Sequence, residues 1–376
     1  MVSKNSVLAI ASLIGTIIGA GVFGIPYLFA KSGVLTSFLY FLILGVVALL
    51  VHLFFGEIVL RTKEKHRLIG YAEKYLGKRA KILVTISIIF GTIGGLLAYT
   101  ILGGNFLKII FPFSLSAFKL SLILWAILSF FVFSGIKSIA PIEFLFNIGF
   151  FAVFVLIVLF SFSKIESSNF TLLNAKYIFL PFGVLLFSLI GWNAVPEIEG
   201  ILKEKKNLKR VIIIAVMAAL VFYFLFGLLI SGVTGKNTTQ EAFQGLVPVL
   251  GQKIMILGGV FGILTISTSF LILANHLKNA LIFDYHFSYP LAFFLACFSP
   301  LLLFLFGIRE FIWVIAVIGT LVGVIEGTTI ALIFKKAKKI GERTPEYSLK
   351  LSRPLLYFTV AVLILGAISQ IIYYFK

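Results

Sequence analysis

Two hydrophobic stretches of this chain carry glycine and proline where an uninterrupted helix would exclude them. Residues 15–26 read Gly-Thr-Ile-Ile-Gly-Ala-Gly-Val-Phe-Gly-Ile-Pro, and residues 187–197 read Phe-Ser-Leu-Ile-Gly-Trp-Asn-Ala-Val-Pro-Glu. Glycine costs about 1 kcal/mol and proline about 3 kcal/mol in the interior of a helix. Both stretches are therefore predicted to unwind and to leave backbone N–H and C=O groups without helical partners.

The two predicted breaks offer opposite partial charges. A helix that begins near Gly21 presents N–H groups and its positive dipole end, which favour a carboxylate. A helix that ends within 187–190 presents C=O groups and its negative dipole end, which favour an ammonium group or a cation. An amino acid carries both groups on one carbon, so the breaks predict a site for a zwitterion. A packing role for small residues such as Gly15 and Gly19 is the alternative.

No catalytic constellation accompanies these breaks. The sequence has four histidines and one cysteine, and it lacks HExxH, P-loop and GxSxG motifs. One cysteine cannot close an intrachain disulfide. The sequence therefore predicts a protein that is not an enzyme and has no resident cofactor. A membrane-embedded transferase is disfavoured because the acidic residues are scattered.

The composition predicts where these breaks lie. Of 376 residues, 60% are hydrophobic and 12% are charged, whereas about 25% are charged in soluble domains. The pattern predicts an all-α integral membrane protein, embedded in the lipid bilayer, with about 11 transmembrane helices. The predicted spans are 7–29, 34–60, 81–110, 117–135, 139–163, 177–200, 208–232, 252–283, 287–307, 310–334 and 353–375.

The net charge of +18 is distributed unevenly between the two sides of this topology. Most lysine and arginine residues fall in the connections 61–81, 203–210 and 335–353, on the side that holds the N-terminus. The positive-inside rule places that side in the cytoplasm. We therefore expect a multi-pass protein of the cytoplasmic membrane, with its C-terminus outside and without a nucleic-acid partner.

The breaks fall in the first and sixth spans, which suggests internal symmetry. Discontinuous helices in corresponding positions indicate an inverted-repeat transporter with its site near the bilayer midplane. The predicted organisation is a single membrane domain, 1–376, with a first repeat at 7–163 and a second at 177–334. The span 353–375 is one additional C-terminal helix.

At these residues the chain resembles the amino acid, polyamine and organocation transporter superfamily, whose members share the LeuT fold. The resemblance rests on Gly19-Ala20-Gly21-Val22-Phe23 followed by Ile25-Pro26, and on Pro196-Glu197-Ile198 followed by the basic segment 203–208. Within the superfamily, the chain is similar to the tryptophan and tyrosine permeases and to the amino acid and auxin permeases.

This resemblance implies a symporter that imports an amino acid by alternating access, driven by a proton or sodium gradient. It places the substrate carboxylate on the backbone of Gly19, Ala20 and Gly21. The ammonium group would lie on the backbone of Phe187, Ser188 and Ile190, and Phe187 or Trp192 would line the pocket. An amino acid exchanger and a transport-inactive sensor on the same fold are alternatives. The resemblance does not define an oligomeric state.

The coupling ion is predicted in two alternative ways. Hydroxyl groups of Thr265, Thr268 and Ser269 could hold sodium together with the carbonyl oxygens of Ile14 and Ile17, as in relatives that use this ion. The alternative is that these hydroxyls bond to carbonyls of their own helix. Some relatives use a lysine of helix five for proton coupling. This chain differs from them, because its span five lacks an internal lysine.

Charged groups within the spans complete the candidates. Glu326 lies deep in span ten, where a carboxyl group could carry a proton, although a structural hydrogen bond is an equal alternative. His52 in span two is interpreted as a neutral, hydrogen-bonded histidine. Glu57 precedes Arg61 by four residues, which is the spacing of an ion pair on one helix face.

Overall fold

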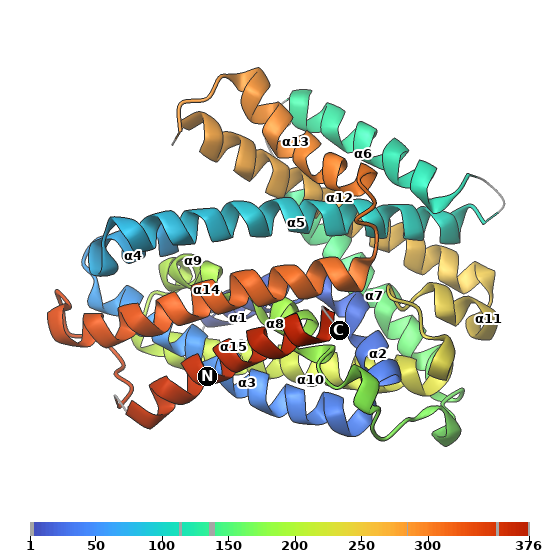
Figure 1. Ribbon diagram of the computed structural model, residues 1–376, viewed down its shortest axis with the longest axis horizontal. Coiled ribbons are helices and arrows are strands. Elements are labelled where there is room, and N and C mark those ends of the chain that lie inside the picture. Colours follow the sequence, from blue (N-terminus) through green and yellow to red (C-terminus); the bar gives the residue numbers. More distant parts are fainter. Residues whose placement is uncertain (1–3, 113–114, 135–139, 284, 351–352, 375–376) are drawn as a thin grey trace.

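The protein is a bundle of helices in this computed structural model (Figure 1), and the described residues form no strand. The structure describes residues 4–112, 115–134, 140–283, 285–350 and 353–374. Residues 135, 139 and 375, each at one boundary of a predicted span, lie outside these ranges. The all-helical membrane fold predicted from sequence is confirmed.

The first predicted break is present in the first span. Helix α1 (Lys4–Ile17) ends and α2 (Gly21–Ser32) begins after three residues, and the two axes differ by 59°. The helices that follow are α3 (Val34–Arg61), α4 (Leu68–Leu76), α5 (Lys78–Ile110), α6 (Ala117–Ser134) and α7 (Ala140–Phe162).

The second predicted break lies after α8 (Pro181–Leu189). A short 3-10 turn, η3 (Trp192–Ala194), leads into α9 (Val195–Ile201), and the chain continues into α10 (Leu208–Thr234). The remaining helices are α11 (Val247–Leu250), α12 (Gln252–Phe283), α13 (Tyr289–Leu305), α14 (Phe311–Ile340) and α15 (Arg353–Tyr374). Further 3-10 turns are η1 (Ser167–Asn169), η2 (Ala175–Tyr177), η4 (Lys205–Asn207), η5 (Gly235–Asn237) and η6 (Gln244–Leu246).

Among the described residues, eight helices are long and apolar enough to cross a membrane, or nine if α1 and α2 form one span. Two further predicted spans coincide with the shorter apolar helices Ala152–Phe162 and Tyr289–Leu305. The count of eleven and the inverted repeat stay predictions.

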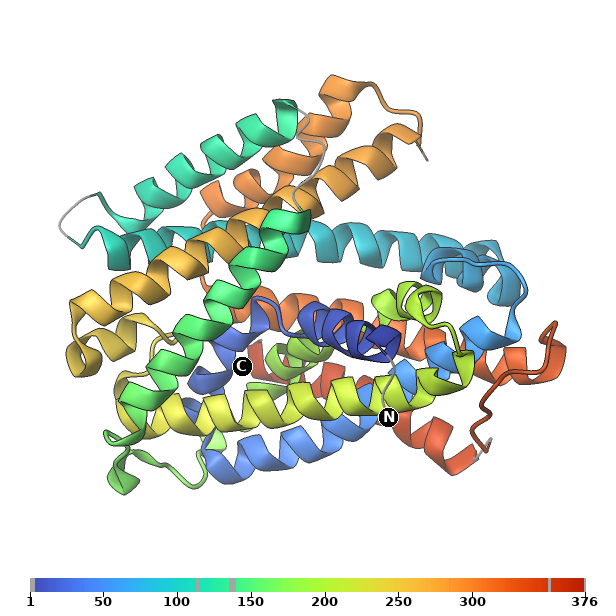
Figure 2. The ribbon, with the colours of Figure 1, turned by 180° about the vertical axis from the view of Figure 1, so that it is seen from behind.

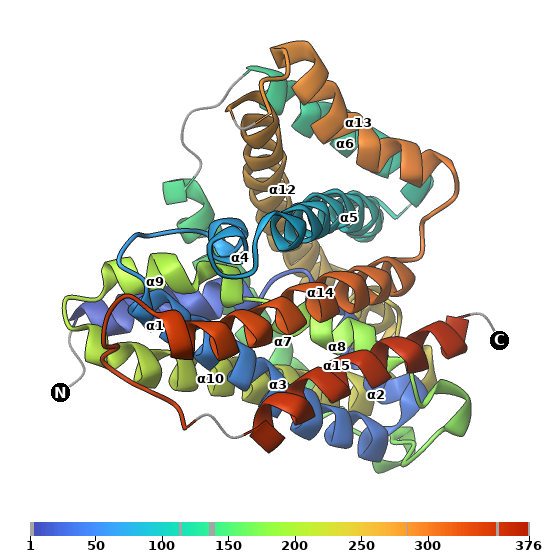
Figure 3. The same ribbon diagram turned by 60° about the vertical axis from the view of Figure 1, so that its left-hand side comes forward.

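The broken helices lie in the middle of the bundle. Figures 1 and 2 show α1, α2, α8 and α9 between α5 on one side and α3 with α10 on the other. Helices α6, α12 and α13 form a further layer beyond α5 (Figure 1). In Figure 3 the start of α1 and the end of α15 lie at opposite ends of the molecule.

Glycine allows α8 to approach α14 at backbone distance. A Cβ atom at Gly319 would lie 2.0 Å from the carbonyl oxygen of Gly183, and one at Gly183 would lie 2.2 Å from that of Ala316. Small residues at such a contact let two membrane helices pack closely. This contact brings the second break next to the middle of α14.

Candidate substrate site

The first break leaves backbone donors free at the start of α2. The amide of Val22 bonds to the carbonyl oxygen of Gly19 at 3.2 Å. In the described part of the chain, the amides of Ala20 and Gly21 have no hydrogen-bond acceptor, and the Ala20 side chain caps nothing. Because the positive end of the α2 dipole lies here, these two N–H groups can bind a carboxylate.

The second break presents the carbonyl end of α8. The amide of Ile190 donates to the carbonyl oxygen of Phe187 at 3.2 Å, and the backbone then turns extended at Ile190. The hydroxyl of Ser188 donates to the carbonyl oxygen of Val184, in its own helix, at 2.8 Å. The negative end of the α8 dipole therefore lies at the same place in the bundle as the free amides of α2.

The two breaks touch, and glycine makes the contact possible. A Cβ atom at Gly21 would lie 2.3 Å from Oγ and 2.8 Å from Cα of Ser188. A Cβ atom at Gly191 would lie 2.4 Å from Cγ1 of Ile17. One glycine in each break, Gly21 and Gly191, is thus required by close approach as well as by unwinding.

Tyr223 of α10 bonds to both breaks. Its buried hydroxyl is 2.7 Å from the carbonyl oxygen of Ile17, to which it donates, and 3.1 Å from that of Ser188. Tyr223 is not among the residues predicted from the sequence. The feature that could have identified it is a tyrosine in the middle of an apolar span, because a buried phenol hydroxyl needs a hydrogen-bond partner.

The open side of the first break is at Gly19. Nothing lies within 4 Å of a Cβ atom placed at Gly15 or Gly19, and both residues are exposed. Phe187, by contrast, packs against α14, since its amide nitrogen lies 2.6 Å from the Cβ position of Gly319. The first break is therefore least crowded at Gly19.

The predicted sodium ligands lie on two helices, and several of them already take part in hydrogen bonds. The carbonyl oxygen of Ile17 accepts from Tyr223 and from the amide of Gly19. The hydroxyl of Thr268 donates to carbonyl oxygens of its own helix, Thr265 at 2.9 Å and Leu264 at 3.2 Å. Helix α1, which carries Ile14 and Ile17, packs against α10 and α9, whereas Thr265, Thr268 and Ser269 lie on α12.

Glu326 of α14 bonds to the second break. One of its oxygens, Oε2, accepts from the indole N–H of Trp192 at 2.7 Å and from the Asn193 amide at 2.9 Å. The ring of His52 lies 5.6 Å from that of Trp192 in an edge-to-face arrangement. The sequence had suggested Trp192 as a pocket residue and Glu326 as a proton carrier, and the structure joins the two side chains.

The end of the bundle that carries α11 is closed by aromatic packing. Phe23 of α2, Phe106 of α5 and Phe243 of the segment after α10 form edge and tilted contacts, with ring centroids 4.8 to 5.7 Å apart. All three rings are almost fully buried. This cluster lies beyond the first break on the α2 side.

The opposite end is held by ion pairs. Glu57 is fully buried and bonds to Arg61, as predicted, and to Lys338, both at 2.8 Å. Glu199 bonds to Lys205 at 2.9 Å and to Lys65 at 3.2 Å. These contacts tie the basic connections to α3, α9 and α14.

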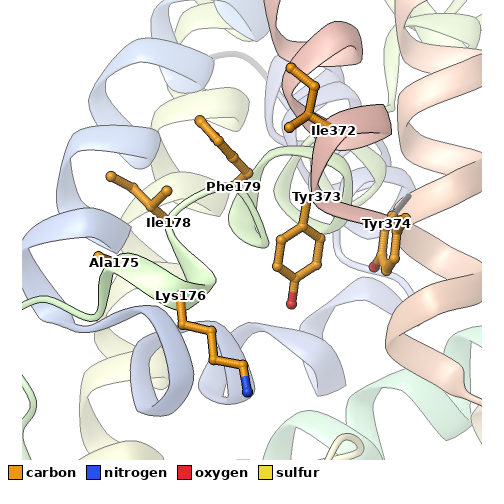
Figure 4. Close-up of a pocket in the computed structure, with 7 residues that line it drawn as sticks. All are labelled: Ala175, Lys176, Ile178, Phe179, Ile372, Tyr373 and Tyr374. Atoms are coloured by element: carbon orange, nitrogen blue, oxygen red, sulfur yellow. The ribbon is translucent and has the colours of Figure 1, made fainter. Parts of the chain in front are cut away.

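A separate pocket of about 490 Å³ lies between the end of α15 and the segment before α8 (Figure 4). Figure 4 shows Tyr373 and Tyr374 opposite residues 175–179. The lining residues are Ala175, Lys176, Ile178, Phe179, Ile372, Tyr373 and Tyr374. None of them belongs to either break, so we do not assign the substrate to this pocket.

Two broken helices that meet at their breaks inside a membrane bundle define a transporter of the LeuT fold. A solved structure, described as the crystal structure of MhsT in complex with L-phenylalanine, aligns over 99% of this chain and 98% of its own, with a TM-score of 0.62 and 15% identity. The model of the tryptophan/tyrosine permease family matches residues 3–370, and the chain belongs to that family. No curated protein matches the sequence. The predicted resemblance is confirmed.

Proposed function

We propose that this protein imports an aromatic amino acid, tryptophan or tyrosine, across the cytoplasmic membrane by alternating access. The observation that carries the proposal is the meeting of free N–H groups at Ala20 and Gly21 with the carbonyl end of α8. This pair of sites suits the carboxylate and ammonium groups of one amino acid. Membership of the tryptophan/tyrosine permease family supports the aromatic side chain.

We place the N-terminus in the cytoplasm and the C-terminus outside. The gathering of the basic connections at one end of the bundle supports this orientation. The Phe23, Phe106 and Phe243 cluster then closes the outer side, and the exposed face of α1 at Gly15 and Gly19 opens toward the cytoplasmic half. The structure corresponds in this proposal to a state that is closed to the outside.

Of the two candidate coupling ions, we favour the proton. The hydroxyl of Tyr223 donates to the Ile17 carbonyl that a sodium ion would need, and Thr268 donates to its own helix. A titratable carboxyl group, Glu326, lies beside the second break instead. These contacts support symport with a proton.

Reconstituted proteoliposomes test the proposed substrate. Labelled tryptophan and tyrosine should enter by counterflow against unlabelled substrate, and tryptamine, which lacks the carboxylate, should compete weakly. Absence of counterflow with either amino acid, from protein that elutes as a folded species, would contradict the proposal.

Ala20→Pro tests the carboxylate contact. Ala20 has φ −55° and an amide without an acceptor in the described chain, so proline fits this φ and removes only a free N–H. We expect tryptophan to bind about tenfold more weakly, the equivalent of one charge-assisted hydrogen bond, with tryptamine binding unchanged. Gly15→Ala, which removes no donor, is the matched control.

A further inference from the structure

Glu326 carries an unsatisfied oxygen in the interior of the bundle. The residue is 1% exposed, and its Oε2 atom takes both hydrogen bonds, from Trp192 and Asn193. In the described part of the chain, its Oε1 atom is buried and has no partner. A charged carboxylate would leave this oxygen without stabilisation, whereas a neutral acid carries its proton there.

Among the described residues, no lysine, arginine or histidine forms an ion pair with Glu326. Helix α8, residues 82–98 of α5 and residues 358–372 of α15 contain no titratable side chain. On α4, Lys74 pairs with Glu342 outside the bundle interior. On α9, Glu197 and Glu199 pair with basic residues, and on α3 Glu57 pairs with Arg61 and Lys338. Helix α2 carries Tyr27 and Lys31, and α4 carries Tyr71 and Tyr75. On α3, the ring of His52 lies 5.6 Å from that of Trp192, the partner of Glu326.

His52 carries an unsatisfied nitrogen beside Trp192, the partner of Glu326. Its Nδ1 atom is 2.8 Å from the carbonyl oxygen of Ala48, and because a carbonyl only accepts, Nδ1 carries the hydrogen. The Nε2 atom is therefore a bare acceptor in the neutral ring, and it is buried without a partner among the described residues. It lies 3.2 Å from the Cβ position of Gly191, so it borders the second break.

We propose that Glu326 and, through its ring contact with Trp192, His52 form the proton site of this transporter, and that Trp192 and Asn193 report the protonation state of Glu326 to α9. The inference rests on the proposed transport function. Loading transfers a proton from water to Oε1 of Glu326, where it forms one O–H bond and makes the acid neutral. Release breaks that bond, returns the proton to water and leaves the carboxylate on Glu326.

The exposed side chain of Asn193 connects this site to the surface. Asn193 is exposed, whereas its partner Glu326 is buried. One hydrogen bond of 2.9 Å therefore separates the carboxyl group from an accessible side chain. Protons reach and leave Glu326 past Asn193.

Protonation changes how firmly α9 is held. Hydrogen bonds to a carboxylate are roughly twice as strong as bonds to a neutral acceptor. The N–H groups of Trp192 and Asn193 therefore bind α14 tightly when Glu326 is charged and weakly when it is neutral. Because α1 packs against α9, a proton on Glu326 frees both broken helices to move together.

Transport under defined gradients tests the proton site. Wild-type proteoliposomes should concentrate labelled tryptophan about tenfold for each pH unit of an inward proton gradient, if one proton moves with each substrate. Glu326→Gln should retain counterflow and lose this accumulation, because glutamine still accepts from Trp192 but carries no proton. Glu241→Gln is the matched control, since Glu241 is also buried but bonds to the amide of Gln244 in its own loop.

A second test measures tryptophan binding as a function of pH. It does not depend on transport rates, and it uses several variants, so that it does not depend on the folding of one of them. The pH midpoint of tryptophan binding should be absent in Glu326→Gln and shifted in His52→Gln. In Trp192→Phe, which keeps the ring but loses one N–H to the carboxylate, the midpoint should move to higher pH. An unchanged midpoint in both Glu326→Gln and Trp192→Phe would overturn the proton site.

The outcomes separate the two proposals. Two results would overturn the proton site and leave amino acid transport standing. In both, the wild type shows counterflow. In the first, Glu326→Gln still accumulates tryptophan in a proton gradient, and in the second, accumulation is driven by sodium alone. Absence of counterflow and of tryptophan binding in the wild type overturns both. Proton-driven accumulation that is lost in Glu326→Gln and kept in Glu241→Gln supports both.

Discussion

The phenol hydroxyl of Tyr223 donates to the carbonyl oxygen of Ile17, 2.7 Å away, at the last residue of α1. The same hydroxyl lies 3.1 Å from the carbonyl oxygen of Ser188, near the end of α8. Both carbonyls stand at helix ends, where helical donors are missing. One side chain of α10 thus satisfies acceptors from both broken helices and fixes their relative position.

Tyr223→Phe removes this link. We expect a loss of about 1 kcal/mol in the free energy of unfolding, because the Ser188 carbonyl loses its donor while Ile17 keeps the amide of Gly19. Tryptophan binding should weaken as well, since the ends of α1 and α8 are no longer held in their relative positions. Chemical unfolding in detergent measures the first effect, and Tyr357→Phe, at an exposed site, should leave both quantities unchanged.

Gly21→Ala should abolish transport. The new Cβ atom would lie 2.8 Å from Cα of Ser188, and a backbone atom cannot rotate away as a flexible side chain can. The two breaks would be forced apart. A Cβ atom at Gly15, which lies in α1, would have nothing within 4 Å. The Gly15→Ala protein should therefore transport normally, and its α1 helix should be more stable by up to about 1 kcal/mol. Equal counterflow rates in the two variants would argue against close contact of the breaks.

The sequence alone predicted both breaks because glycine and proline act locally. Their cost in a helix depends on the residue itself, and the predicted positions agree with the gaps between α1 and α2 and between α8 and α9. The exposure of Gly19 and the contact of Gly21 with Ser188 depend instead on packing between helices. No local pattern distinguishes these two glycines.

The partners of polar side chains were not predictable for the same reason. Tyr223 is 206 residues from Ile17 in sequence, and Trp192 is 134 residues from Glu326. Each side chain could be identified as unusual within an apolar span, but its partner is chosen by helix packing. Glu57 and Arg61 were predictable as a pair because they are neighbours on one helix face, whereas the contact of Glu57 with Lys338 was not.

Glu57→Gln should destabilise the folded protein by about 3 kcal/mol, because it leaves two largely buried cations without their shared carboxylate. The side chains of Arg61 and Lys338 are only 15% and 12% exposed. Glu346→Gln is the control, since its pair with Arg343 is more exposed and should contribute less than about 1 kcal/mol. Denaturant midpoints of the two variants, measured in the same detergent, compare the two pairs, and similar midpoints would contradict the central role of Glu57.

Glu342 should make stability depend on pH in acid. The Lys74 ammonium group at 2.7 Å, together with the backbone N–H of Lys63, holds the pKa of this carboxyl below its ordinary value of 4.5. The charged form is therefore favoured by folding, so its contribution is present above pH 4.5 and disappears as the pH falls through the lowered pKa. Between about pH 6 and pH 3, the melting temperature should fall less in Glu342→Gln than in the wild type. Glu204→Gln, at an exposed site, should follow the wild-type curve, and a Glu342→Gln curve that also does so would show that the contact with Lys74 adds nothing to folding.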